Sequence, residues 1–295
     1  MRLADFLREQ ALEPEELYRS HGRSGWTALQ RDAGLLNTPE GAEDEYFGRR
    51  FADLLHYDDP EQVDLLLRVG EAAVPYEALS EREHRRLQML AYQVDGQHHQ
   101  TGTGKDFLAR LSQTPDIRAE LGELGNVLQA RSNFRSRPVP GLDDVPLCLY
   151  AGYGVREILT SVGWLTPGRR TPFQAGVLAL QDRNVELLFV TLDKSEGFHD
   201  RIAYHDYAIS ADRFHWQSQN SAGPDTTAGR RYLESPKNGW SFQLFVRRSK
   251  GEPYRACGPV MLEQAEGTKP MSIIWRLAVP LPVHLFQEFS VLRGQ

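Results

Sequence analysis

The first 130 residues repeat apolar positions at intervals of three and four, the spacing of one face of an α-helix. One such face holds Leu121, Leu124 and Leu128. We therefore expect a helical domain over residues 1–130. Three residue pairs in this part are typical of helix starts, because they supply N-capping side chains or a first-turn proline: Asp59 before Pro60, Ser80 with Glu83, and Thr114 before Pro115.

The pattern changes after residues 131–144, a stretch rich in Arg, Ser, Pro and Gly that indicates a linker. Beyond it, short apolar runs alternate with turn residues, which favours β-strands. Residues 175–180 and 185–192 flank a polar turn and predict a hairpin. We expect an α+β chain in which residues 145–295 form a β-rich bent sheet or barrel. Further strands are expected at 145–150, 241–246, 257–262 and 272–277, and short helices at 155–162 and 283–292.

Composition narrows the class of protein only slightly. The chain has 295 residues, 40% hydrophobic and 25% charged, as is normal for a globular protein. It has no apolar run of membrane-spanning length and no signal-peptide pattern at its N-terminus. Its two cysteines, Cys148 and Cys257, are isolated, so we expect core thiols in a reducing cytoplasm and no zinc knuckle or disulfide scaffold.

The charge is distributed unevenly. The formal net charge is -6, but residues 145–295 carry 17 Lys and Arg against 14 Asp and Glu, a net of +3. Residues 1–144 carry 17 against 26, a net of -9. The second half is thus the better candidate to meet phosphate, although ordinary surface scatter also explains a charge of this size.

Several familiar chemistries lack their motifs. The stretch from His99 to Asp106 resembles a phosphate-binding loop, but the first position is not Gly and no Ser or Thr follows Lys105. His98 and His99 are adjacent, which does not suit a two-histidine metal site. No nuclease signature or Gly-x-Ser-x-Gly elbow is recognisable. We expect no cofactor, no metal and no catalytic residue.

The densest group of residues suited to recognising a nucleobase lies at 204–220. Aromatic rings stack on bases, Asp accepts from an exocyclic amine, and Gln bonds base edges. The candidates are Tyr204, Asp206, Tyr207, Trp216, Gln217 and Gln219, with Tyr153 added because it lies in a glycine-flanked turn. Basic candidates for backbone phosphate are Lys194, Arg213, Arg230 and Arg231.

A purely structural interpretation fits part of this group equally well. In a strand, Phe214, Trp216 and Ser218 share one face, and Gln217 and Gln219 share the other. The aromatic face then either packs into the core or contacts the base. Asp206 also suits a turn or cap, and each basic residue suits a solvated surface.

The same stretch resembles a known family. Five segments of the second half are similar to a helicase-associated domain of unknown function. They are Tyr204–Tyr207, Phe214–Gln219, Gly258–Val260, Pro270–Leu277 and Leu188–Lys194. In that family the domain usually follows a phospholipase-D-like nuclease and a helicase. The resemblance is strong from about residue 145 to 280 and modest before that.

Relatives of this nuclease–helicase–domain arrangement include modification-dependent restriction enzymes. Their C-terminal domain resembles the SET-and-RING-associated (SRA-like, PUA-like) fold. The resemblance implies a reader of 5-methylcytosine or 5-hydroxymethylcytosine in duplex DNA, which flips the base into an aromatic pocket. The chain contains neither the nuclease nor the helicase, so binding carries over and cleavage does not. On this reading it is a stand-alone DNA-binding protein.

Two other functions remain open. One is a nuclease with an unusual site made of His199, Asp200, His205 and Asp206. The other is an interaction module or specificity subunit of a restriction or anti-phage system, whose acidic helical half docks a separate helicase or nuclease.

Overall fold

The structure is a computed structural model that describes residues 1–18, 25–72, 74–95, 102–132, 135–168, 173, 176–193 and 206–290. The chain divides into two compact units. The helical unit comprises Met1–Pro138 and Asp144–Thr171, and the sheet unit comprises Val139–Asp143 and Pro172–Gln295.

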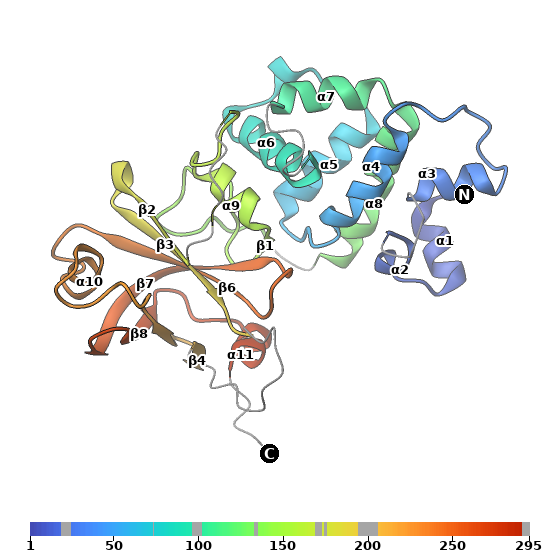
Figure 1. Ribbon diagram of the computed structural model, residues 1–295. Coiled ribbons are helices and arrows are strands. Elements are labelled where there is room, and N and C mark those ends of the chain that lie inside the picture. The colour runs from blue at the N-terminus through green and yellow to red at the C-terminus, as the bar shows by residue number, and fades with distance from the viewer. Residues whose placement is uncertain are drawn as a thin grey trace. The chain divides into compact units, whose positions relative to one another are not determined.

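Most of the helical unit comes from residues 1–130, over which the sequence predicts a helical domain (Figure 1). Its buried apolar side chains, which include Phe47, Leu66 and Leu121, form one core. Its described elements are α1 (Leu3–Gln10), α2 (Pro14–Tyr18), α3 (Trp26–Asp32), α4 (Asp44–Arg50), η1 (Phe51–Leu54), α5 (Pro60–Glu71), η2 (Tyr76–Ala78), α6 (Glu81–Asp95), α7 (Gly104–Ser112), α8 (Pro115–Arg131), β1 (Gly152–Tyr153) and α9 (Val155–Ser161).

The predicted helix starts are confirmed. The Asp59 side chain accepts a hydrogen bond from the Glu61 backbone N–H at the start of α5, and Pro115 is the first residue of α8. The stretch that resembles a phosphate loop ends in a helix start as well. There, Thr103 and Asp106 form a capping box that begins α7.

Helices α5 and α8 pack closely because glycines face each other. A Cβ added at Gly70 would lie 2.2 Å from the backbone nitrogen of Gly122. No side chain fits at this crossing, so the two helix backbones are in direct contact.

Residues 144–171 group with the helices, whereas the sequence assigns them to the C-terminal domain. Residues 145–150 are not a strand, since Pro146 interrupts the run and Tyr150 adopts a positive φ of 70°. Polar contacts hold this segment to the helical unit. The Tyr153 hydroxyl donates to Asp59 Oδ2 at 2.5 Å, and Arg82 donates to the Val145 carbonyl at 3.1 Å.

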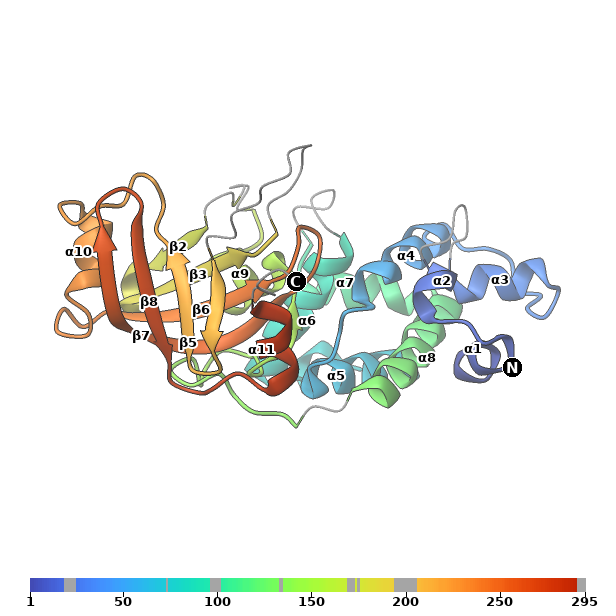
Figure 2. The same cartoon turned by 90° about the horizontal axis from the view of Figure 1, so that it is seen from below.

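The sheet unit contains one mixed sheet (Figure 2). Its strands follow the order β2-β3-β6-β7-β8-β5-β4. Only the β3–β6 pair is parallel among these neighbours. The described elements are β2 (Val177–Leu180), η3 (Gln181–Arg183), β3 (Val185–Thr191), β4 (Tyr207–Ser210), β5 (Arg213–Gln217), α10 (Thr227–Leu233), β6 (Ser241–Arg247), β7 (Tyr254–Gly267), β8 (Met271–Leu277) and α11 (Val283–Phe289).

The predicted hairpin is confirmed as β2 and β3, and Asn184 closes its turn in the left-handed conformation. Register shifts interrupt three strand pairs: β4–β5, β6–β7 and β7–β8. Such irregularities bend a sheet and increase its twist. The described strands form a sheet that bends without closing, so the fold is α+β with an open mixed sheet rather than a barrel.

Aromatic side chains fill the inside of the bend. Trp275 is fully buried, with ring centroids 5.0 Å from Phe242, 6.1 Å from Trp216 and 6.3 Å from Tyr232. Next to this aromatic cluster, buried Glu186 accepts a hydrogen bond from the Tyr232 hydroxyl at 2.8 Å. Trp216 therefore has the surroundings of a core residue.

Within the described ranges, no helix is both long enough and apolar enough to cross a membrane. The two cysteines are buried free thiols, as expected. Burial raises the pKa of Cys148 to about 11 and that of Cys257 to about 12, so neither is a reactive thiolate at neutral pH.

Candidate functional site

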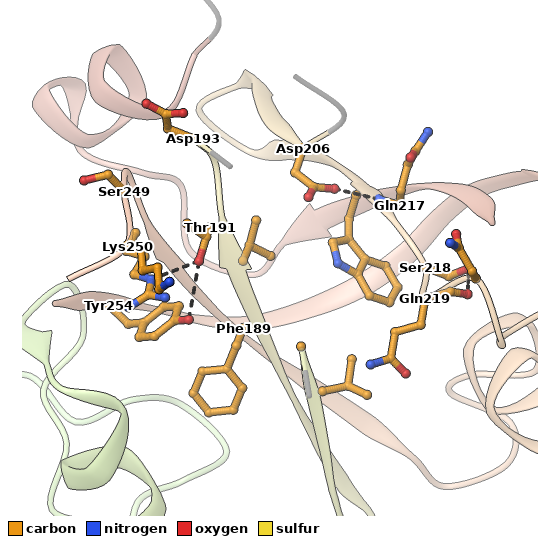
Figure 3. A pocket seen from close by; sticks show the side chains of 16 residues that line it. Phe189, Thr191, Asp193, Asp206, Gln217, Ser218, Gln219, Ser249, Lys250 and Tyr254 are labelled. Carbon is orange, nitrogen blue, oxygen red and sulfur yellow. Dashed lines mark hydrogen bonds between the residues drawn. The ribbon is translucent and has the colours of Figure 1, made fainter. Parts of the chain in front are cut away.

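A cleft of about 790 Å³ opens in the sheet unit between β3 and β5. These strands are not neighbours, because β6, β7 and β8 separate them in the sheet order. The bend of the sheet brings them to facing sides of the cleft. Residues that lie far apart in the sequence, from Gly176 to Tyr254, therefore line one space (Figure 3).

One side, which we call the amide side, consists of Asp206 and residues 216–220. Asp206 is buried, and its Oδ1 accepts a hydrogen bond from the backbone N–H of Gln217 at 2.8 Å. A carboxylate offers about four acceptor positions, so Asp206 can accept from an amine of a ligand in addition to its protein partners. Figure 3 shows Asp206, Ser218 and Gln219 along this side.

Ser218 fixes the chain at the end of β5. Its Oγ donates to the Ala222 carbonyl at 3.0 Å and accepts from the Met271 backbone N–H at 2.9 Å. The next residues, Gln219 and Asn220, are progressively more exposed and carry their amides to the cleft. Amide groups both donate and accept, which suits the edge of a base.

The facing side, which we call the basic side, comes from the end of β3, the end of β6, the start of β7 and the β6–β7 connection. Its members are Thr191, Asp193, Arg247, Ser249, Lys250 and Tyr254. Arg247 Nε donates to Thr191 Oγ1 at 2.9 Å, and its guanidinium lies over the Tyr254 ring at 4.4 Å. The Thr191 and Tyr254 hydroxyls are 3.5 Å apart.

Apolar surface lies between the two sides. Phe189, Val190 and Val177 line the cleft, and Trp216 contributes a wall although it is only 4% exposed. Phe189 stacks on Phe245 with ring centroids 5.5 Å apart. The cleft thus combines aromatic walls with a carboxylate, amides and cations, the groups that a base-binding pocket uses.

The structure brings together four of the seven predicted base-binding residues: Asp206, Trp216, Gln217 and Gln219. Tyr207 does not line the cleft, and its ring stacks on His215 at 5.1 Å. Tyr153 belongs to the helical unit, where it is buried and bonded to Asp59. Its ring is not accessible for stacking on a base. Tyr204 lies outside the described residues.

None of the four residues predicted to contact phosphate is among the described residues that line the cleft. Arg213 pairs with Glu263 at 2.7 Å. Arg231 pairs with buried Glu186 at 3.0 Å and lies over the Trp240 ring. Arg230 is exposed on α10, and Lys194 lies outside the described residues. Both Arg213 and Arg231 therefore already have a carboxylate partner.

Of the four residues of the alternative nuclease site, Asp206 is described and lies in the cleft. His199, Asp200 and His205 lie outside the described residues, as do His98 and His99. Within the described ranges, no group of three His, Cys, Asp or Glu is arranged to hold a metal ion.

Sequence reasoning did not identify Phe189, Thr191 or Tyr254 as site residues. Phe189 and Thr191 lie in a strand that belongs to the resemblance, but nothing in their spacing points to a ligand. Arg247 is recognisable only as one of several basic residues that flank 204–220. Their roles depend on the bend of the sheet, which the local pattern does not specify.

In a comparison with known families, residues 147–289 match the Domain of unknown function (DUF3427). The matched segment includes α9 of the helical unit and continues through the sheet to α11. It contains every residue of the cleft. A comparison with curated proteins finds no match.

Proposed function

We propose that this chain is a DNA-binding protein whose cleft receives a modified cytosine, 5-methylcytosine or 5-hydroxymethylcytosine, flipped out of a duplex. The observation that carries the proposal is that a single cleft combines aromatic walls, a buried carboxylate and amide groups. An extruded base needs stacking surface and hydrogen-bond partners to offset the few kcal/mol lost on unstacking. The proposed activity is binding without cleavage.

Each side chain has a role in this proposal. Asp206 accepts the exocyclic amine of the base, and the Gln219 amide bonds its edge. Trp216 and Phe189 provide the walls against which the ring lies. The apolar floor at Val177 and Val190 suits a methyl substituent, which gains from leaving water.

The carboxylate alone does not select cytosine, because adenine also presents an amine. Residues 204–219 resemble the helicase-associated domain of unknown function, and the SRA-like readers of modified cytosine among relatives of that domain arrangement support the choice of base. They also support duplex DNA as the partner, since those readers extract the base from a duplex.

The proposal is tested by the affinities of the full chain for three matched duplexes that differ only at one position. These carry cytosine, 5-methylcytosine or 5-hydroxymethylcytosine. We expect at least one modified duplex to bind about tenfold or more tightly than the plain one, about 1.4 kcal/mol. Equal affinity for all three, measured at the same salt concentration, would overturn the proposal.

A further inference from the structure

The cleft is larger than a single base requires. Its volume of about 790 Å³ falls within the roughly 300–1,000 Å³ of pockets that bury whole drug-sized ligands. A pyrimidine ring is much smaller than such a ligand. A base placed against the amide side therefore leaves the basic side to other parts of the nucleotide.

The charges of the cleft are divided between its two sides. Among the described residues that line the cleft, the basic side carries Arg247, Lys250 and one carboxylate, Asp193, whereas the charged residue of the amide side is Asp206. An amine donor is favoured at one side and an anion at the other. A nucleotide has this polarity, since its base presents an amine and its backbone a phosphate.

Arg247 is the best placed of these cations. The hydrogen bond to Thr191 and the contact with the Tyr254 ring fix its guanidinium from two strands. Unlike Arg213 and Arg231, it forms no ion pair with the residues that the structure describes. A guanidinium that is held in one orientation, and that has no carboxylate partner among the described residues, is well suited to bind phosphate oxygens.

We infer that the cleft holds a whole nucleotide, with Arg247 binding a backbone phosphate next to the flipped base. This inference rests on the proposed function and adds the phosphate subsite to it. The sequence predicts that Arg213 and Arg231 contact the phosphates of the DNA backbone. The inference assigns such a contact to Arg247, which lies inside the cleft.

The test combines a neutralised phosphate with a neutralised arginine. Duplexes with modified cytosine carry a single methylphosphonate, which removes one phosphate charge, immediately 5′ or 3′ of that base. With the wild-type chain, we expect one of the two positions to weaken binding roughly tenfold. With Arg247→Gln, binding to the unaltered duplex should weaken similarly, its log–log salt dependence should become shallower by about one unit, and that methylphosphonate should cause little further loss.

Arg248→Gln is the matched control, because Arg248 is exposed and does not line the cleft. This variant should keep the full methylphosphonate effect. Arg247→Lys, which keeps the charge, should also keep most of it and serves if Arg247→Gln folds poorly.

Independent, additive losses from Arg247→Gln and from both methylphosphonates would overturn the phosphate subsite. So would a wild-type chain that is indifferent to both methylphosphonates. Either result leaves the proposed function standing if modified duplexes are still preferred. Loss of that preference in the wild-type chain would instead refute the proposed function.

Discussion

Replacing Asp206 by Asn should lower the affinity for a modified duplex roughly 10- to 100-fold and remove most of the preference over plain cytosine. The amide oxygen of Asn can still accept the Gln217 backbone N–H, so the local structure is retained. The second carboxylate oxygen of Asp206 is replaced by an NH₂ group in Asn. In the proposed complex this group and the amine of the base are both donors, so no hydrogen bond forms between them. Fluorescence anisotropy titrations on the matched duplexes measure the change.

Asp212→Asn is the control for this variant, since Asp212 lies in the turn between β4 and β5 and does not line the cleft. It should leave both affinity and preference within about twofold of the wild-type values. A folded Asp206→Asn protein that still discriminates as the wild type does would show that the amine acceptor lies elsewhere.

Replacing Arg86 by Met should lower the free energy of unfolding of the helical unit by about 3–5 kcal/mol. The Arg86 side chain is 2% exposed and donates to Asp59 Oδ2 at 2.6 Å. Asp59 also accepts from the Tyr153 hydroxyl and the Cys148 thiol, so its carboxylate stays buried after the change. Removing only the cation leaves that charge uncompensated. Urea unfolding followed by helical circular dichroism measures the difference.

Arg68→Met is the comparison for this effect. Arg68 is 43% exposed and lies 3.6 Å from Asp64 in an i,i+4 pair, so its loss should cost only about 1 kcal/mol or less. If the two variants lost equal stability, the buried Asp59 network would not be what holds residues 144–171 to the helices.

The sequence predicts elements of this fold better than it predicts their assembly. Helix starts at Asp59 and Pro115, and the hairpin that turns at Asn184, follow from local chemistry that acts within a few residues. Residues 144–171 are different, because their attachment depends on bonds from Tyr153 and Arg82 to partners far away in the chain. No local pattern reports such bonds.

In the candidate site, too, some residues are predictable from the local sequence and others are not. Asp206, Trp216 and Gln219 stand out in the sequence because aromatic, acidic and amide residues cluster there. The basic side does not stand out, since Thr191, Arg247 and Tyr254 meet only when the sheet bends. Tyr207 and Trp216 also show why alternation is ambiguous: it separates the two faces of a strand without saying which one meets a ligand.

The most direct test of the account is whether the cleft itself receives the base. Among the described residues, a Cβ added at Gly176 would meet the Phe189 carbonyl oxygen at 3.6 Å, an ordinary van der Waals contact, so Gly176→Trp can place a ring in the cleft without clashing with that backbone. Gln181→Trp, at an exposed position outside the cleft, is the control.

The measurement uses duplexes with 2-aminopurine beside the modified cytosine, because its fluorescence rises when a neighbouring base leaves the stack. We predict a rise on binding of the wild-type chain and of Gln181→Trp, and none with Gly176→Trp, whose preference for the modified duplex should also be lost. An undiminished rise and full preference in folded Gly176→Trp would contradict the account, because the base would then be received outside this cleft.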